Sequence, residues 1–151
     1  MDWFVRAFMK SSLFWLGVGV TLGLALTVWP GLVVYRTAHL HINLLGFVAQ
    51  IIYGVALHII PRFFGQPLVY RRMAEAQFWL AQGGLALLAG GFALRAAGLP
   101  ASQGVIIAGA VGSGLAAYCF IVNVWRTINA SPMRAVIGRG GRSVPLQPQA
   151  M

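Results

Sequence analysis

Three histidines are the side chains best suited to chemistry in this sequence, and all of them fall within one apolar segment. The segment begins Tyr35-Arg-Thr-Ala-His-Leu-His-Ile-Asn-Leu-Leu-Gly46, and His58 lies near its end. Ionisable side chains are costly in such segments, so by default they indicate a functional site. A neutral imidazole in apolar surroundings is a ligand for heme iron or for copper. Heme and copper are therefore the first cofactor hypotheses, with heme favoured because no Met or Cys cluster accompanies the histidines.

His39 and His41 are predicted to point in opposite directions. On an α-helix they lie about 200° apart, so they do not ligate one metal from the same helix face, as a pair four residues apart does. We expect the helix to separate two clefts, with one histidine facing each cleft. His58 lies about 25 Å of helix beyond His41, too far to share a metal with it. It is interpreted as a packing residue or as the ligand of a second, inner heme.

Small and polar residues continue the His39 face at helical spacing: Asn43, Gly46, Gln50 and Gly54. Small residues allow either a flat ligand or another helix to approach closely. We therefore include Gly46, Gln50 and Gly54 among the predicted cofactor-binding residues, although hydrogen bonding between helices is the favoured role for Asn43 and Gln50. Arg36 lies one turn toward the aqueous face, where a guanidinium can bind heme propionates.

The composition indicates that these residues are held by membrane-spanning helices. Apolar residues make up 59% of the 151 residues, only 9% are charged, and the mean hydropathy is +0.79. A bilayer span needs about 20 apolar residues. Four stretches meet this length, approximately Ser12 to Trp29, Ala38 to Ile60, Phe78 to Arg95 and Ala101 to Trp125. The prediction is an all-α membrane protein: a four-helix heme-binding domain over residues 1–130 and a flexible basic tail over residues 131–151.

The distribution of basic residues predicts the topology. The chain carries 11 Lys and Arg against two acidic residues, a net charge of +9. Nine of the 11 fall at the chain ends and between the second and third spans, and Lys and Arg resist translocation. Both termini are therefore predicted to be cytoplasmic, in a bacterial inner membrane, with His39 and His41 near the outer face. This topology explains the positive charge better than nucleic-acid binding does.

The second span resembles a known family. Thr37-Ala38-His39, together with Gly46, Gly54, Pro61, Gly65 and Phe78-Trp79-Leu80, resembles the second span of the heme-copper oxidase catalytic subunit and the residues after that span. Ala38-His39-Leu40-His41 with Leu45-Gly46, Gly54, His58, Pro61, Gly65 and Phe78 resembles the tenth span of that subunit equally well. The resemblance covers about residues 35 to 90. In the family, the histidines at these places are axial ligands of the hemes.

The double resemblance implies an oligomer. The catalytic subunit of the family has twelve spans in three quasi-repeated arcs of four, and this chain has the spans of one arc. The resemblance implies a homotrimer, favoured over a dimer, in which His39 of one protomer and His41 of the next hold one heme. Because the chain has no Cys-x-x-Cys-His motif, heme b is expected.

The departures from the family limit the predicted function. The oxidase copper centre needs three histidines, and the first span of this chain has none. We predict a b-type cytochrome that transfers electrons, exchanging them with a quinol or a periplasmic redox protein, rather than a self-sufficient oxidase; whether the chain is an enzyme is left open. The alternatives are a heme-based oxygen or nitric oxide reductase or sensor, and a heme or copper carrier or oxidase assembly subunit.

Overall fold

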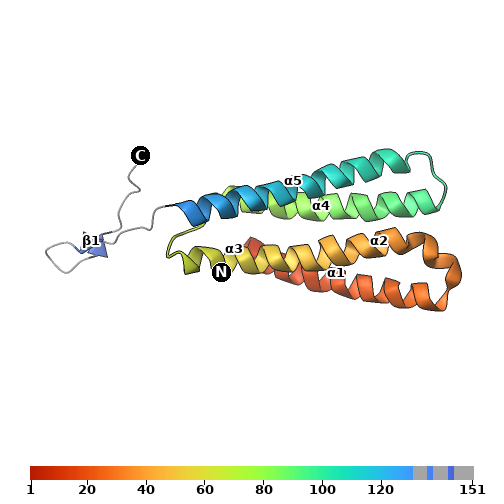
Figure 1. Ribbon diagram of the computed structural model, residues 1–151, viewed down its shortest axis with the longest axis horizontal. Coiled ribbons are helices and arrows are strands. Elements are labelled where there is room, and N and C mark those ends of the chain that lie inside the picture. The colour runs from red at the N-terminus through yellow and green to blue at the C-terminus, as the bar shows by residue number, and fades with distance from the viewer. Residues whose placement is uncertain (131–135, 138–142, 145–151) are drawn as a thin grey trace.

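The computed structural model describes residues 1–130, 136–137 and 143–144, and long helices make up most of it (Figure 1). In chain order the elements are α1 (Trp3–Val28), the 3-10 helix η1 (Pro30–Tyr35), α2 (Arg36–His41), the π-helix η2 (Ile42–Ala49), α3 (Gln50–Phe63), α4 (Arg71–Ala96) and α5 (Ser102–Asn129). Two short strands, β1 (Val136–Ile137) and β2 (Ser143–Val144), pair antiparallel.

The prediction of a largely helical protein with four candidate membrane spans is confirmed. Four helical units are long and apolar enough to cross a bilayer: Trp3–Val28, Pro30–Phe63, Arg71–Ala96 and Ser102–Asn129. Each is longer than its apolar stretch, because helix continues into the polar residues that flank the stretch. α1, for example, begins at Trp3 and includes the exposed Arg6 and Lys10. Apart from the two strands, the predicted flexible tail lies outside the described residues.

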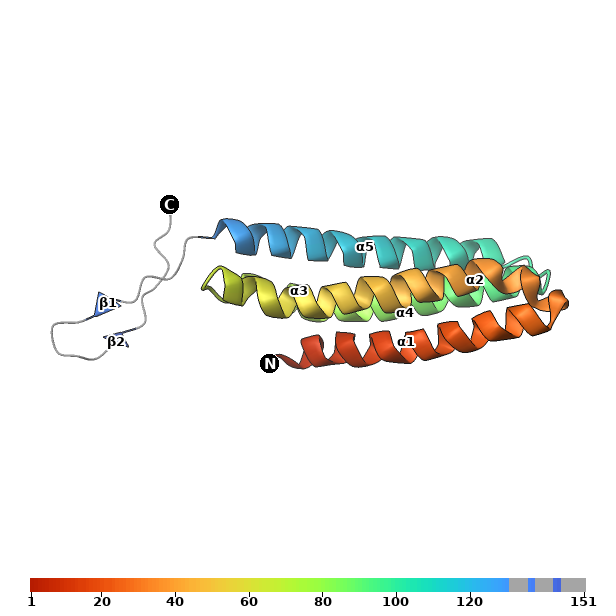
Figure 2. The same ribbon diagram turned by 60° about the horizontal axis from the view of Figure 1, so that its bottom comes forward.

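The helices form two antiparallel pairs that lie against each other (Figures 1 and 2). One pair is α4 with α5, and the other is α1 with the continuous unit of α2, η2 and α3. The N-terminus and the end of α5 lie at the same end of the bundle, whereas α2 lies toward the opposite end. His39 and His41 are therefore remote from the N-terminal end, and His58, near the end of α3, is close to it.

Small residues let the backbones of α4 and α5 meet. A Cβ atom added to Gly84 would lie 2.5 Å from the backbone nitrogen of Ser113, and one added to Gly91 would lie 2.7 Å from Ile106. Gly84 and Gly91 are seven residues apart, the spacing that keeps a contact seam facing its partner in a left-handed helix pair. Close packing of this kind is the main attraction between helices in a bilayer, where burial of apolar surface gives no advantage over lipid.

The apolar core is concentrated at the N-terminal end of the bundle. Phe8 contacts Phe78 edge to face with ring centroids 5.1 Å apart, and Trp3 contacts Phe78 at 5.7 Å. The cluster contains Phe4, Val5, Phe8, Leu57, Ala74, Phe78, Ala81 and Ala116. Edge-to-face aromatic pairs are favourable because the positive ring edge meets the negative ring face. The end that carries His39 and His41 lies outside this cluster.

The second span departs from the plain α-helix that the sequence predicts. Its buried residues recur every four positions, at Ala38, Ile42, Gly46, Gln50 and Gly54. In an α-helix each step of four rotates the side chain by about 40°, so the stripe would wind around the helix. The π-helix η2 has wider turns and compensates for this rotation. It begins after His41, so the opposite directions predicted for His39 and His41 are unaffected.

The α4–α5 contact can be tested with two neighbouring glycines. Gly84→Ala places a methyl group against the α5 backbone and is expected to lower the free energy of unfolding by about 1–3 kcal/mol. At Gly83 a Cβ atom would meet nothing within 4 Å. Gly83→Ala is therefore expected to be neutral or to stabilise by up to about 1 kcal/mol through helix propensity. Unfolding of the purified protein in mixed detergent measures both; equal effects would contradict the close contact.

Candidate functional site

His39 lies in the contact between α2 and α1. A Cβ atom added to Gly23 of α1 would lie 2.9 Å from Cε1 of His39, so only glycine leaves room for the ring. The Asn43 amide donates from Nδ2 to the His39 backbone carbonyl at 3.0 Å, and the same nitrogen lies 3.2 Å from Nδ1 and 3.5 Å from Nε2 of the His39 ring. Because one donor lies beside both ring nitrogens, Asn43 positions the His39 ring but does not select its tautomer.

His41 is held in one tautomer by its own helix. Its Nδ1 lies 2.8 Å from the backbone carbonyl of Thr37. A carbonyl only accepts hydrogen bonds, so Nδ1 carries the proton and Nε2 presents its lone pair. Metal-bound histidines are oriented by the same bond, in which the ring nitrogen that does not bind metal donates to a backbone carbonyl. His41 is thus held as the tautomer that ligates through Nε2.

The two rings contact different helices, as their 200° separation predicts. His39 packs against α1, whereas the His41 ring lies beside Phe92 of α4, with centroids 4.9 Å apart. Both side chains are partly exposed. One protomer therefore does not bring the two imidazoles to a common point, and each serves a separate side of the second span.

A helix occupies most of the small-residue face that the sequence assigns to a flat ligand or another helix. A Cβ atom added to Gly46 would lie 2.8 Å from Trp15 of α1, and one added to Gly54 would lie 3.1 Å from Phe8 and Met9. Helix α1 is equally close beside Asn43: a Cβ atom added to Gly19 of α1 would lie 2.5 Å from Asn43 Oδ1. In this structure α1 therefore packs against the glycines of the second span.

Gln50 forms hydrogen bonds to other helices, the role that the sequence favours for it, within a polar network inside the bundle. Its Oε1 accepts from Ser11 Oγ at 2.6 Å and from Gln82 Nε2 at 2.7 Å. Gln82 also accepts from Trp15 Nε1 at 3.0 Å, so the network joins α1, α3 and α4. Nε2 of Gln50 and both amide atoms of Gln77 are buried with no partner among the described residues. The sequence signal available for this network was the presence of amide side chains at corresponding depths in separate spans.

Arg36 and His58 lie at opposite ends of the second span. Arg36 is exposed at the start of α2, one turn before His39 and His41. At the other end, Arg62 Nη1 donates to His58 Nδ1 at 2.6 Å and to the His58 backbone carbonyl at 2.7 Å. His58 is therefore separate from the other two histidines. Within the described residues, no group of three or more His, Cys, Asp or Glu side chains forms a metal site.

The chain was also compared with known proteins. No protein-family model and no curated protein matches it. The contacts of His39 and His41 and the motif between residues 35 and 90 are therefore the basis for a functional hypothesis.

The His41 tautomer is directly measurable. In protein labelled with ¹⁵N at histidine and purified without added cofactor, we expect His41 to be protonated at Nδ1. Its hydrogen bond to the Thr37 carbonyl requires a proton on that nitrogen. Nitrogen NMR distinguishes protonated from unprotonated ring nitrogens, and His39→Gln and His41→Gln assign the signals. An unprotonated Nδ1 at His41 would contradict the described contact.

Proposed function

We propose that this protein is a b-type cytochrome of a bacterial inner membrane, with its termini in the cytoplasm and its heme near the periplasmic face. His41 of one protomer and His39 of its neighbour hold the heme iron, and the assembly is a homotrimer with a site at each junction. Its activity is electron transfer, with a quinol or a periplasmic redox protein as the partner.

The observation that carries this proposal is the state of His41. The bond from Nδ1 to the Thr37 carbonyl fixes the ring and leaves the Nε2 lone pair available, as an axial ligand requires. The ring is partly exposed on a span with few charges. Copper fits this site less well, because no Met or Cys cluster accompanies the histidines.

Sharing between protomers is supported by the different neighbours of the two histidines. A single chain offers one imidazole on the α1 side and one on the α4 side, so a bis-histidine site needs a second copy. In a ring each protomer uses both histidines, one at each junction. A two-fold dimer pairs like surfaces and leaves one histidine per protomer unused. The exposed apolar residues Leu40, Leu44, Val48 and Ile52 of the second span supply a surface for such a neighbour.

The other residues of the proposed site have different roles. Arg36 would pair with a heme propionate, because its guanidinium is exposed one turn from the histidines. Gly46, Gln50 and Gly54 set the distance between the second span and α1, and they would act on the heme through the position of His39. His39 would hold the iron only if its contact with Asn43 changed. When bound, the heme would supply a one-electron iron couple.

The contact between His39 and Asn43 also favours a second candidate function. If His39 keeps that hydrogen bond, His41 is the sole histidine ligand, and the iron retains a position for a gas. The protein would then be a heme-based reductase or sensor of oxygen or nitric oxide. The two functions differ in one structural respect, which is whether His39 binds iron.

Mixed assemblies test the shared site. His39→Ala and His41→Ala are each expected to lose the bis-histidine heme, because every junction lacks one ligand. When both variants are co-expressed with different tags and purified through both tags, each mixed trimer regains one junction with both histidines. The mixed preparation is therefore expected to hold about one third of the heme of the unsubstituted protein. Heme is measured from the absorbance of its pyridine complex.

His58→Ala is the matched control, because it removes a histidine of the same span at the other end. It is expected to keep the full heme content. If the mixed trimers hold no more heme than the single variants, the ligands do not come from neighbouring protomers. If His39→Ala alone keeps its heme and gains a carbon monoxide shift, the gas-binding function replaces electron transfer.

A further inference from the structure

A cavity of about 610 Å³ lies at the N-terminal end of the bundle, away from His39 and His41. It is bounded by the end of α3, the loop between α3 and α4, and the first residues of the chain. Its charged and polar side chains include Asp2, His58, Arg62 and Arg71, and its apolar side chains include Leu57 and Leu68. The volume falls in the range of small-molecule sites, about 300–1,000 Å³.

The loop that bounds this cavity is held in place by α5. Asn123 bonds the Tyr70 backbone at both polar groups, accepting from its nitrogen at 3.1 Å and donating to its carbonyl at 2.9 Å. Gln66 donates to the backbone carbonyl of Thr127, and the Thr127 hydroxyl accepts from Val69 at 3.3 Å. Asn123 and Thr127 are fully buried. The loop is thus a fixed wall of the cavity.

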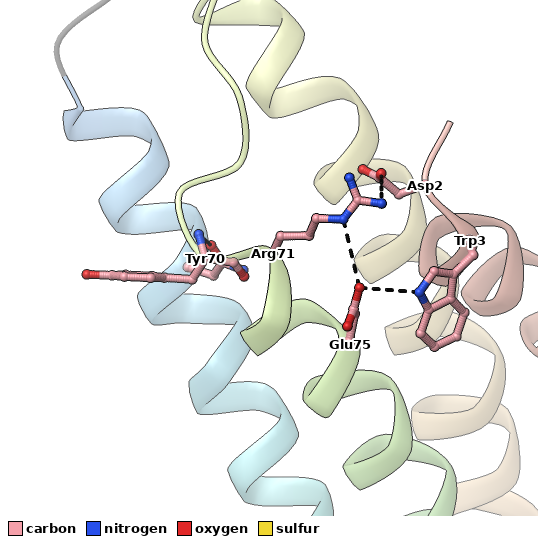
Figure 3. A network of polar contacts seen from close by, with 6 residues as sticks. Asp2, Trp3, Tyr70, Arg71 and Glu75 are labelled. Atoms are coloured by element: carbon pink, nitrogen blue, oxygen red, sulfur yellow. Dashed lines mark hydrogen bonds and ion pairs between the residues drawn. The ribbon is translucent and has the colours of Figure 1, made fainter. Parts of the chain in front are cut away.

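Both acidic side chains of the protein already pair with Arg71 beside this cavity. The chain contains only two, Asp2 and Glu75. Figure 3 shows both facing Arg71, whose guanidinium lies 2.8 Å from Asp2 and 3.8 Å from Glu75. Trp3 Nε1 donates to Glu75 at 3.3 Å and completes the network. No acidic side chain of this chain is therefore left to neutralise Arg62.

Arg62 and His58 together present hydrogen-bond donors toward the cavity. Arg62 uses Nη1 for His58, and among the described residues its Nε and Nη2 groups make no other hydrogen bond. Because His58 Nδ1 accepts from Arg62, the His58 proton is on Nε2, which is a further donor. A guanidinium and an imidazole N–H that lack an anion are suited to a phosphate oxygen, which accepts charge-assisted hydrogen bonds.

We propose that this cavity binds the phosphodiester headgroup of one anionic phospholipid. Arg62 and His58 donate to the phosphate, and Leu57 and Leu68 contact the glycerol and the first acyl carbons. A lipid fits better than a free anion because the cavity adjoins the end of a membrane-spanning helix and has apolar as well as charged walls. Basic pockets between spans at the cytoplasmic side are suited to anionic headgroups. The proposal does not depend on the heme site.

Lipid titration of the full-length protein tests this site. Native mass spectrometry in detergent measures binding of phosphatidylglycerol, with phosphatidylcholine and inorganic phosphate as separate probes. The solution contains about 0.3 M salt, which screens charges outside the cavity. Arg62→Gln is expected to weaken phosphatidylglycerol binding about fivefold or more. Arg72→Gln is the matched control: it removes one exposed charge at the same end, and Arg72 does not line the cavity. It is expected to change the affinity less than twofold.

Helicity by circular dichroism verifies that both variants fold. The site is supported if phosphatidylglycerol binds more tightly than phosphatidylcholine and only Arg62→Gln weakens it. If Arg62→Gln and Arg72→Gln weaken phosphatidylglycerol binding equally, general surface charge and not this cavity attracts the lipid, and the proposal is overturned. Equal binding of the two lipids would also overturn it. Binding of inorganic phosphate with the same dependence on Arg62 would make the ligand a soluble anion instead of a lipid.

Discussion

The close approach of α1 to the second span is the constraint on which the candidate site depends. Gly19 and Gly23 of α1 leave room for Asn43 and His39, and Gly46 of the second span leaves room for Trp15. In a bilayer, helices gain little from burying apolar surface, so fits of this kind decide how they pack. With the His39 side of the span against α1, His41 points away from α1 and lies beside Phe92 of α4. The two imidazoles therefore have different neighbours, although they are only two residues apart.

The sequence predicts the spans well because long apolar stretches leave a membrane protein few alternatives. It also predicts the opposite directions of His39 and His41, since that depends only on local helix geometry. It does not predict what lies against Gly46 and Gly54, because a glycine face suits a helix and a flat ligand equally. The π-helix and the partners of Gln50, which are Ser11 and Gln82, were missed for a related reason: both depend on contacts between helices distant in sequence.

His39 and His41 are positioned by different contacts within the bundle, and this difference bears on function. His41 is oriented by its own helix through Thr37, so in the proposed site its orientation would require no other span. His39 is positioned by Asn43 and by the glycines of α1, and in the proposed site its binding to iron would require these contacts to change. This asymmetry separates an electron carrier, which uses both histidines, from a gas-binding protein, which uses one.

The optical spectrum of the purified full-length protein tests the proposed heme site most directly, recorded as reduced minus oxidised, with and without carbon monoxide, and with heme quantified. We expect sharp low-spin bands, about one heme per chain and no shift with carbon monoxide, because in the proposed site two histidines would hold the iron and leave no position for the gas. A colourless protein that gains no such bands when heme is added would contradict the proposed cytochrome.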